Sequence, residues 1–164
     1  MIIRSAKIAD TEKIALTHSA SIEALCAEYY PPENIAGWVD VLSPGIYEDA
    51  IKERVMIVAE DEDEIVGLGI LDLERKQIGA IYVHPKVKGT GVGRRLLLKL
   101  EAIASKNEAD RLTLCATINA YGFYHHHGYA GAERLFHELP NDVRLECIQM
   151  QKTLDKTNKP ATGV

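Results

Sequence analysis

A basic, glycine-rich turn is the part of this sequence with the clearest chemical use. Gly89, Gly91 and Gly93 alternate with other residues, after an apolar run at residues 78–83 and before an amphipathic stretch. This order predicts a strand, a loop and the start of a helix. The first N–H groups of a helix have no partner within it, and with the helix dipole they attract phosphate, which glycines let the backbone approach closely. The turn therefore has the layout of an anion site.

Positive charge gathers around the same turn. The sequence places four cationic residues there: Lys86, Lys88, Arg94 and Arg95. Two other phosphate motifs do not fit, because a P-loop requires Gly-Lys-Ser/Thr and the dinucleotide-binding fingerprint requires G-x-G-x-x-G, whereas these glycines run G-x-G-x-G. Glycines serve tight turns more often than they bind phosphate, but four cations beside three alternate glycines favour binding.

Short strands and helices surround this turn. Apolar spacing predicts strands at residues 1–6, 55–60, 65–73, 78–83, 112–115, 135–139 and 143–151. It predicts a long helix that opens near Asp10, a short helix from Pro32, an amphipathic helix from residue 91 and a short helix at residues 120–127. A loop is expected at residues 43–45. The order favours an α/β fold with a mixed sheet and helices on both faces, in which only the unit around residues 78–115 needs to be parallel.

Length and composition indicate one acidic globular domain. The chain has 164 residues, of which 46% are hydrophobic and 26% charged, and its formal net charge is -5. This composition excludes a disordered or fibrous protein. We expect a single domain at residues 1–154 and a disordered tail at residues 155–164. The negative balance argues against a nucleic-acid partner, since such affinity comes mainly from Lys and Arg contacts with phosphates.

Cysteine and histidine give no sign of a disulfide framework or a metal site. Cys26, Cys115 and Cys147 are odd in number, widely spaced and without a C-x-x-C pair, so the sequence predicts neither a disulfide framework nor a zinc knuckle. Three consecutive histidines at residues 125–127 would point about 100° apart on a helix and so would not share one ion. No apolar stretch is long enough for a signal segment or a membrane span, so we expect a cytoplasmic protein without a membrane partner.

Two segments resemble motifs of the GCN5-related N-acetyltransferase (GNAT) superfamily. The acyl-CoA loop of that superfamily reads Gln/Arg-x-x-Gly-x-Gly/Ala after a strand that ends in an apolar-aromatic triplet, and here KGTGVG at residues 88–93 follows IYV at residues 81–83. Lys88 replaces the usual Gln or Arg, which keeps the charge but loses the planar fork of arginine. Residues 117–129 resemble the late motif, in which an Asn-Ala pair, a Phe-Tyr pair and a Gly-aromatic pair follow one another at fixed spacing. The resemblance spans residues 2–154.

This resemblance implies a GNAT-like fold, with a mostly antiparallel sheet of about seven strands, a parallel central pair that splays apart, and helices on both faces. In the superfamily, the pantetheine arm of acetyl-CoA lies in the splay and the glycine turn holds the pyrophosphate. The implied acetyl-CoA-binding residues are Ile81, Tyr82, Val83, Lys88, Gly89, Thr90, Gly91, Val92, Gly93, Arg94, Asn119 and Phe123. A backbone N–H near Val83 would polarise the thioester carbonyl. Which of Lys88, Arg94 and Arg95 reaches the outer phosphates stays open.

The late motif supplies a catalytic candidate. Tyr124 stands at the position of the superfamily's general acid, which protonates the leaving CoA thiolate. The alternative is that Tyr124 only packs. Asn119 either caps the following short helix with its side chain or hydrogen-bonds the pantetheine arm.

The sequence does not identify a general base. Relatives carry Glu or His on the strand before the glycine turn, but the positions in register here are Gln77 and Gly79. Three carboxylates remain candidates that would act through water: Glu28, Asp72 and Glu74. The amine acceptor could also arrive already neutral.

Residues 18–38 resemble a bacterial branch of the superfamily that acts on small substrates, and this resemblance places Tyr29, Tyr30 and Trp38 at the acceptor cleft. Core packing is an equal alternative for Trp38. An aromatic, acidic cleft favours a small amine, so the first hypothesis is an acetyl-CoA-dependent N-acetyltransferase that acts on a primary amine of a small molecule. The alternatives are a non-catalytic acyl-CoA sensor and an enzyme that acetylates a protein or peptide amine. The last hairpin presents an edge through which a homodimer could form.

Overall fold

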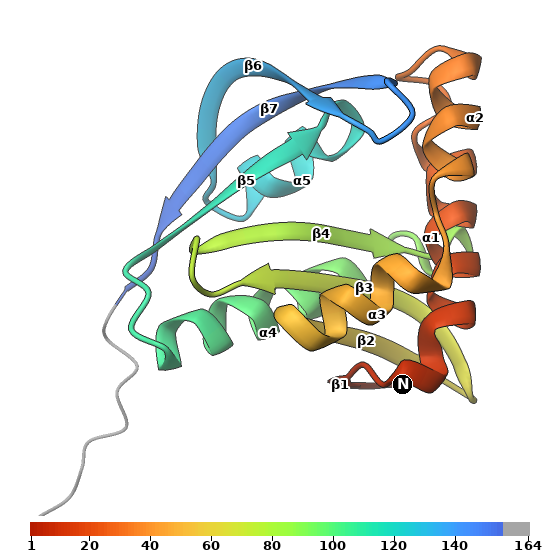
Figure 1. The fold of residues 1–164 in the computed structure, drawn as a ribbon. Coiled ribbons are helices and arrows are strands. Elements are labelled where there is room, and N and C mark those ends of the chain that lie inside the picture. The colour runs from red at the N-terminus through yellow and green to blue at the C-terminus, as the bar shows by residue number, and fades with distance from the viewer. Residues whose placement is uncertain (156–164) are drawn as a thin grey trace, which may run out of the picture.

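A seven-stranded sheet runs through the molecule in the strand order β1-β2-β3-β4-β5-β7-β6 (Figure 1). The computed structural model describes residues 1–155, so the tail predicted at residues 155–164 lies outside the described residues apart from Asp155. The strands are β1 (Ile2–Ser5), β2 (Val55–Asp61), β3 (Glu64–Asp72), β4 (Gln77–Val83), β5 (Arg111–Thr117), β6 (Ala130–Glu138) and β7 (Arg144–Thr153). Among these described residues, only β4 and β5 pair in parallel, which confirms the predicted α/β fold class.

Residues 1–155 form five α-helices, four of which pack on the two faces of the sheet. They are α1 (Thr11–Leu25), α2 (Pro32–Asp40), α3 (Pro44–Glu53), α4 (Val92–Lys106) and α5 (Tyr121–His126). The side chains of α4 and α5 pack in one hydrophobic core, whereas α1 and α3 pack on the opposite face in a second core. Strand β3 is buried along most of its length because it lies between these layers. Helices on both faces were predicted, and the structure confirms them.

A third core lies at one end of the sheet, where α1 and α2 meet the β6–β7 hairpin. Trp38 of α2 and Leu145 of β7 are both buried there. The turn of the hairpin also contacts α2, because the Asn141 side-chain amide donates a hydrogen bond to the Gly37 carbonyl at 2.8 Å. Figure 1 shows that α1 runs past both the β1–β4 part and the β5–β7 part of the sheet on this side.

Helix α3 was not predicted, because residues 43–45 were interpreted as a loop. Ser43 is the N-cap and Pro44 the first helical residue. Proline suits that position, since its fixed φ is helical and the N–H it lacks would have no partner there. The Pro-Gly pair therefore begins a helix, and it brings Tyr47 into the core at 2% exposure.

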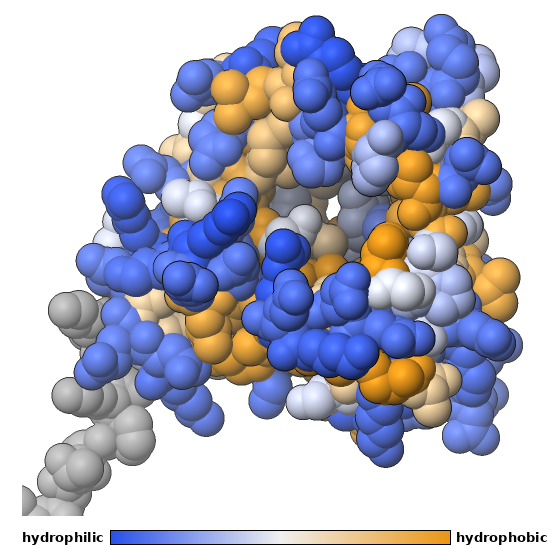
Figure 2. All heavy atoms as spheres, in the orientation of Figure 1, coloured by the Kyte–Doolittle hydropathy of each residue, from blue (hydrophilic) through white to orange (hydrophobic). Residues whose placement is uncertain are grey.

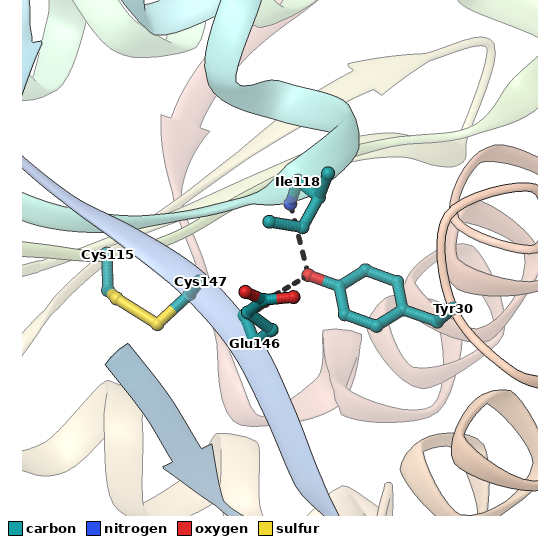
Figure 3. The surroundings of a disulfide bond; sticks show 5 residues. All are labelled: Tyr30, Cys115, Ile118, Glu146 and Cys147. Carbon is teal, nitrogen blue, oxygen red and sulfur yellow. Dashed lines mark hydrogen bonds between the residues drawn. A yellow bond between two sulfur atoms is a disulfide. The ribbon is translucent and has the colours of Figure 1, made fainter. Parts of the chain in front are cut away.

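Cys115 on β5 and Cys147 on β7 form a disulfide bond, with their Cα atoms 5.6 Å apart (Figure 3). The prediction from cysteine spacing was therefore wrong for this pair. In the antiparallel β5–β7 ladder, Cys115 lies opposite Gln149 and Thr117 lies opposite Cys147, which makes the two cysteines diagonal neighbours. Their separation of 32 residues carries no local signal, because strand pairing alone brings them together. Cys26 is free and buried.

We expect the packing of α4 on the sheet to dominate stability, and two leucines of this helix test it. Leu100 is fully buried, whereas Leu98 is 41% exposed. Leu100→Ala should lower the free energy of unfolding by about 3 kcal/mol, because it removes apolar contacts and leaves a cavity. The matched control Leu98→Ala should lower it by less than about 0.5 kcal/mol. Urea denaturation measures both, and equal effects would contradict this placement of the core.

Candidate functional site

The parallel strands β4 and β5 separate after only two residue pairs. Gln77 pairs with Thr113 and Ile78 with Leu114, and beyond them no pairing continues. A register shift in the β3–β4 ladder between Ile70 and Leu71 leaves an extra residue in β4 at this point. The separation opens a hollow lined by Ile78, Gly79, Ala80, Ile81, Tyr82, Leu114, Cys115, Thr117, Ala120 and Tyr124. Figure 2 shows the surface hollowed between the two parts of the molecule.

Backbone groups of β4 face this hollow. The His84 N–H donates to the Val66 carbonyl on β3 at 2.8 Å. In an antiparallel ladder, successive residues direct their hydrogen-bonding groups to opposite sides. The N–H groups of Ile81 and Val83 therefore point away from β3, toward the side where β5 has separated. Both residues belong to the set that the sequence resemblance assigns to acetyl-CoA binding.

The glycine turn ends at the start of α4. Gly89 and Gly91 have φ angles of 78° and 87°, in the left-handed region that favours glycine. The N–H of Arg95 bonds to the Gly91 carbonyl at 3.0 Å and is the first amide to bond within the helix. The three amides before it, those of residues 92–94, project from the helix end without intrahelical partners. A Cβ built at either left-handed glycine would meet no atom within 4 Å, so the space above the turn is open.

Three cations beside this turn are exposed. Among residues 1–155, Lys88, Arg94 and Arg95 form no ion pair. Lys86 differs, since its ammonium group pairs with Glu64 at the β2–β3 turn. Helix-start amides without intrahelical partners and cations without ion pairs therefore lie at one place, which is the combination that favours negative charge. The structure thus brings together the glycines and three of the four cations singled out in the sequence.

Helix α5 joins the turn to the hollow through two aromatic residues. The Phe123 ring lies against the turn, because a Cβ at Gly93 would be 3.5 Å from it. The Phe123 ring also contacts Tyr124 edge-on, with a centroid distance of 5.1 Å. Tyr124 is 6% exposed and lines the hollow. Burial raises the pKa of its phenol above the usual value, so Tyr124 keeps its proton at neutral pH.

Asn119 does not cap α5. The N-cap of that helix is Ala120, and no side chain bonds to the helix start. The Asn119 Oδ1 atom is instead buried and has no hydrogen-bond partner among residues 1–155. The capping interpretation is therefore wrong. An unpaired buried acceptor is costly unless a ligand donates to it, so the alternative hypothesis of a contact with pantetheine remains a prediction.

The aromatic residues expected at the acceptor cleft lie in different environments. Tyr29 is 52% exposed, whereas Tyr30 and Trp38 are buried. The Tyr30 hydroxyl accepts a hydrogen bond from the Ile118 N–H at 3.0 Å and donates to the Glu146 carbonyl (Figure 3). Tyr30 thus links the segment between α1 and α2 to both β5 and β7. Its ring also packs edge-on against Trp38.

Sequence reasoning missed His18 of α1, which is buried between β4 and α3. Its ring contacts Tyr82 of β4 at a centroid distance of 4.0 Å, and its Nδ1 is 2.8 Å from the Tyr47 hydroxyl. Its Nε2 is buried without a partner among residues 1–155. Burial lowers the pKa of His18 to about 3, so the ring is neutral and cannot serve as a base at neutral pH. The available signal was its position on the apolar stripe of the first helix, four residues after Ile14.

The carboxylates proposed as bases lie on the periphery. Glu28 and Glu74 are exposed. Asp72 is half-buried at the end of β3, where Arg54 and Arg75 each lie 3.9 Å from it. The register positions on β4 hold Gln77 and Gly79, which cannot accept a proton near neutral pH. No carboxylate or neutral imidazole of suitable pKa therefore stands beside the hollow in the described part of the chain.

Neither a membrane helix nor a metal cluster appears in the described residues. Within residues 1–155, no helix has the length and apolar character needed to cross a bilayer. The same residues contain no group of three or more His, Cys, Asp or Glu side chains that could hold a metal ion.

Comparisons with known proteins agree with this geometry. Residues 26–154 match the model of the acetyltransferase (GNAT) domain. The structure of a GCN5-related N-acetyltransferase from Rhodopseudomonas palustris is similar over 93% of this chain and 95% of that one, with 28% identity and a TM-score of 0.84. The PaiA N-acetyltransferase from Thermoplasma acidophilum in complex with coenzyme A has 20% identity over 93% and 98% of the chains, with a TM-score of 0.77. YncA from Salmonella typhimurium with acetyl-CoA has 20% identity over 99% of both chains, with a TM-score of 0.61. No curated protein matches the chain.

His18 should make stability dependent on pH. Its folded pKa of about 3 lies below the value of about 6.5 in an unfolded chain, so between these pH values the unfolded state binds a proton that the folded state does not. Stability from this residue is complete above about pH 6.5 and falls as the pH decreases. We expect the wild type to lose about 2 kcal/mol more than His18→Gln between pH 7 and pH 5. Urea denaturation at both pH values measures this difference.

The control for this measurement is His137→Gln, since His137 is exposed on β6. It should keep the pH dependence of the wild type. A His18→Gln protein with an unchanged pH dependence would show that His18 is not held neutral by burial.

Proposed function

Because this chain belongs to the GNAT acetyltransferase family, we propose that it is an acetyl-CoA-dependent N-acetyltransferase that transfers an acetyl group to a primary amine of a small molecule. The observation that carries the proposal is the separation of β4 from β5 beside a helix start whose amides are unpaired. A strand-like ligand with a polyphosphate at one end fits both features. Acetyl-CoA supplies the activated acetyl group, and the chain supplies the contacts that follow.

The pyrophosphate would be held by the amides of residues 92–94, with charge from Lys88, Arg94 or Arg95. From that point, the pantetheine arm would run along β4 and pair with those backbone groups of Ile81 and Val83 that point away from β3. The unpaired Oδ1 of Asn119 would accept a hydrogen bond from an amide of the arm. The complexes of two similar structures with coenzyme A and acetyl-CoA support this choice of ligand.

Direct transfer requires one polarised carbonyl and one proton donor. An N–H of β4 near Val83 would hydrogen-bond the thioester oxygen, where negative charge develops as the amine attacks, a contribution of about 3 kcal/mol in comparable sites. Tyr124 would then protonate the departing thiolate of CoA. Burial keeps the Tyr124 phenol protonated, which suits a donor. The position of Tyr124 at the hollow supports this role.

The net charge of -5 and the exposed cations of the glycine turn leave the remaining surface strongly acidic, which supports a cationic acceptor. Tyr82, which lines the hollow, and the exposed Tyr29, which the resemblance places at the acceptor cleft, support a small molecule. A non-catalytic acyl-CoA sensor is a second candidate, and the observation that favours it is the lack of a proton acceptor at Gln77 and Gly79.

Calorimetry with CoA and a thiol-release assay with acetyl-CoA test the proposal together. CoA should bind, and at least one acceptor among polyamines, amino acids, aminoglycosides and peptides should release thiol. Release with peptides alone would move the acceptor to the peptide class. Tight CoA binding without release for any acceptor would favour the sensor, and the absence of CoA binding would overturn both.

Gly91→Asp should remove CoA binding. The substitution places a negative side chain in the open space where the pyrophosphate would lie, at a left-handed φ of 87°. The matched control is Gly45→Asp in the first turn of α3, where a Cβ would meet only the Ser43 hydroxyl at 3.9 Å. We expect an affinity loss of roughly a hundredfold or more for Gly91→Asp, equivalent to about 2.7 kcal/mol, and no change for the control. Affinity retained in both would contradict the placement of the pyrophosphate.

Tyr124→Phe should lower kcat by roughly a hundredfold and leave the KM for acetyl-CoA nearly unchanged. The substitution removes only the hydroxyl and preserves the packing of the ring. Tyr121→Phe on the same helix is the control, because Tyr121 stacks on His125 and does not line the hollow. Steady-state kinetics with one responsive acceptor measures both variants. An unchanged kcat for Tyr124→Phe would assign this residue to packing.

A further inference from the structure

The Cys115–Cys147 disulfide borders the hollow between β4 and β5. Cys115 is half-buried and lines the hollow, whereas Cys147 is 5% exposed and does not. Tyr124, the residue assigned to protonate the CoA thiolate, lines the same hollow. One residue of the disulfide, Cys115, therefore borders the space in which the proposed reaction would release a thiol.

The order of the strands fixes the direction from which a thiol can reach the Cys115 sulfur. Strand β5 lies between β4 and β7, with Cys147 on the β7 side and the hollow on the β4 side. A thiolate in the hollow therefore approaches Cys115 from the side opposite Cys147. Thiol–disulfide exchange proceeds by attack of a thiolate on one sulfur while the other sulfur leaves. The arrangement makes Cys115 the attacked sulfur and Cys147 the leaving group.

We propose that Cys115 is a covalent attachment site for coenzyme A, formed by exchange between the CoA thiol and the Cys115–Cys147 disulfide. The proposal rests on the proposed function, since it requires CoA in the hollow. In the exchange, a bond forms between the CoA sulfur and Cys115 Sγ, and the bond between Cys115 Sγ and Cys147 Sγ breaks. The electron pair goes to Cys147, which takes up the proton that the CoA thiol gave up. No external oxidant or reductant takes part.

The mixed disulfide would hold CoA in the place that acetyl-CoA needs and so would block turnover. The exchange is reversible, because the Cys147 thiol stays next to the adduct and returns CoA to solution by the reverse attack. The sheet does not depend on the disulfide, since seven residue pairs join β5 to β7 from Arg111 to Thr117. Free CoA would thereby inhibit the protein reversibly, by a covalent route that a CoA analogue without sulfur cannot follow.

The test is to incubate the oxidised protein with CoA in the absence of oxygen, block free thiols by alkylation, and map the peptides by mass spectrometry. The expected product carries the full mass of CoA on Cys115 and the alkyl group on Cys147. The adduct should form at least about tenfold faster with CoA than with glutathione at equal concentration, because binding holds the CoA thiol beside the disulfide. A reductant should release the CoA.

Variants of the three cysteines sharpen the result. Cys115→Ser and Cys147→Ser should form no adduct with CoA, since neither contains the disulfide. Cys26→Ser should react as the wild type does, because Cys26 is buried and free. An adduct on Cys147, or equal rates with CoA and glutathione, would overturn the proposal. Alkylation of both Cys115 and Cys147 in the untreated protein would also overturn it, since the disulfide would be absent.

Calorimetry with desulfo-CoA separates this proposal from the proposed function. Binding of desulfo-CoA without a CoA adduct would overturn the exchange and leave the proposed function intact. No binding of desulfo-CoA would overturn both. Binding of desulfo-CoA together with the adduct on Cys115 is the outcome that supports both.

Discussion

The separation of β4 from β5 is the constraint on which the rest of this structure depends. Buried backbone groups must find hydrogen-bond partners, and a sheet normally supplies them through the neighbouring strand. Here the parallel pairing stops after Ile78, and the N–H groups of Ile81 and Val83 face a hollow instead of a strand. These backbone groups are therefore free to pair with an extended polar ligand, as the proposed function requires, and the packing around the hollow keeps the two strands apart.

Beyond the two residue pairs of β4 and β5, helices and side chains connect the two parts of the sheet, β1–β4 and β5–β7. Tyr30 hydrogen-bonds to Ile118, just after β5, and to Glu146 on β7, so it anchors the β5–β7 part of the sheet to the segment between α1 and α2. On the opposite face, Phe123 and Gly93 bring α5 against the glycine turn. The disulfide adds a covalent link within the β5–β7 pair. Packing on both faces of the sheet thus sets the width of the hollow. Residues of α1, α4 and α5 therefore all lie around the same site.

The parts of the site that sequence predicted are the parts that local chemistry determines. Gly89 and Gly91 adopt the left-handed φ that such a turn requires, and α4 begins where the amphipathic stretch begins. Helix α3 escaped prediction because a Pro-Gly pair can either break a chain into a loop or begin a helix, and only the burial of Tyr47 decides between them. The Cys115–Cys147 disulfide depends on the pairing of strands distant in sequence, which residue spacing does not encode.

Tyr124 and His18 are both buried near the hollow, but burial shifts their pKa values in opposite directions. Burial raises the pKa of Tyr124 and lowers that of His18, so one holds its proton and the other stays neutral across the physiological range. Both effects have the same cause, because a dry environment disfavours the charged form of either group. The residues that line the hollow therefore include a phenol that can donate a proton, but among the described residues none of those lining it is a carboxylate or an imidazole. Under the proposed function, loss of the amine proton would then occur in solvent or through water at a more distant carboxylate, and the pKa of the acceptor itself would become part of the selectivity for a substrate.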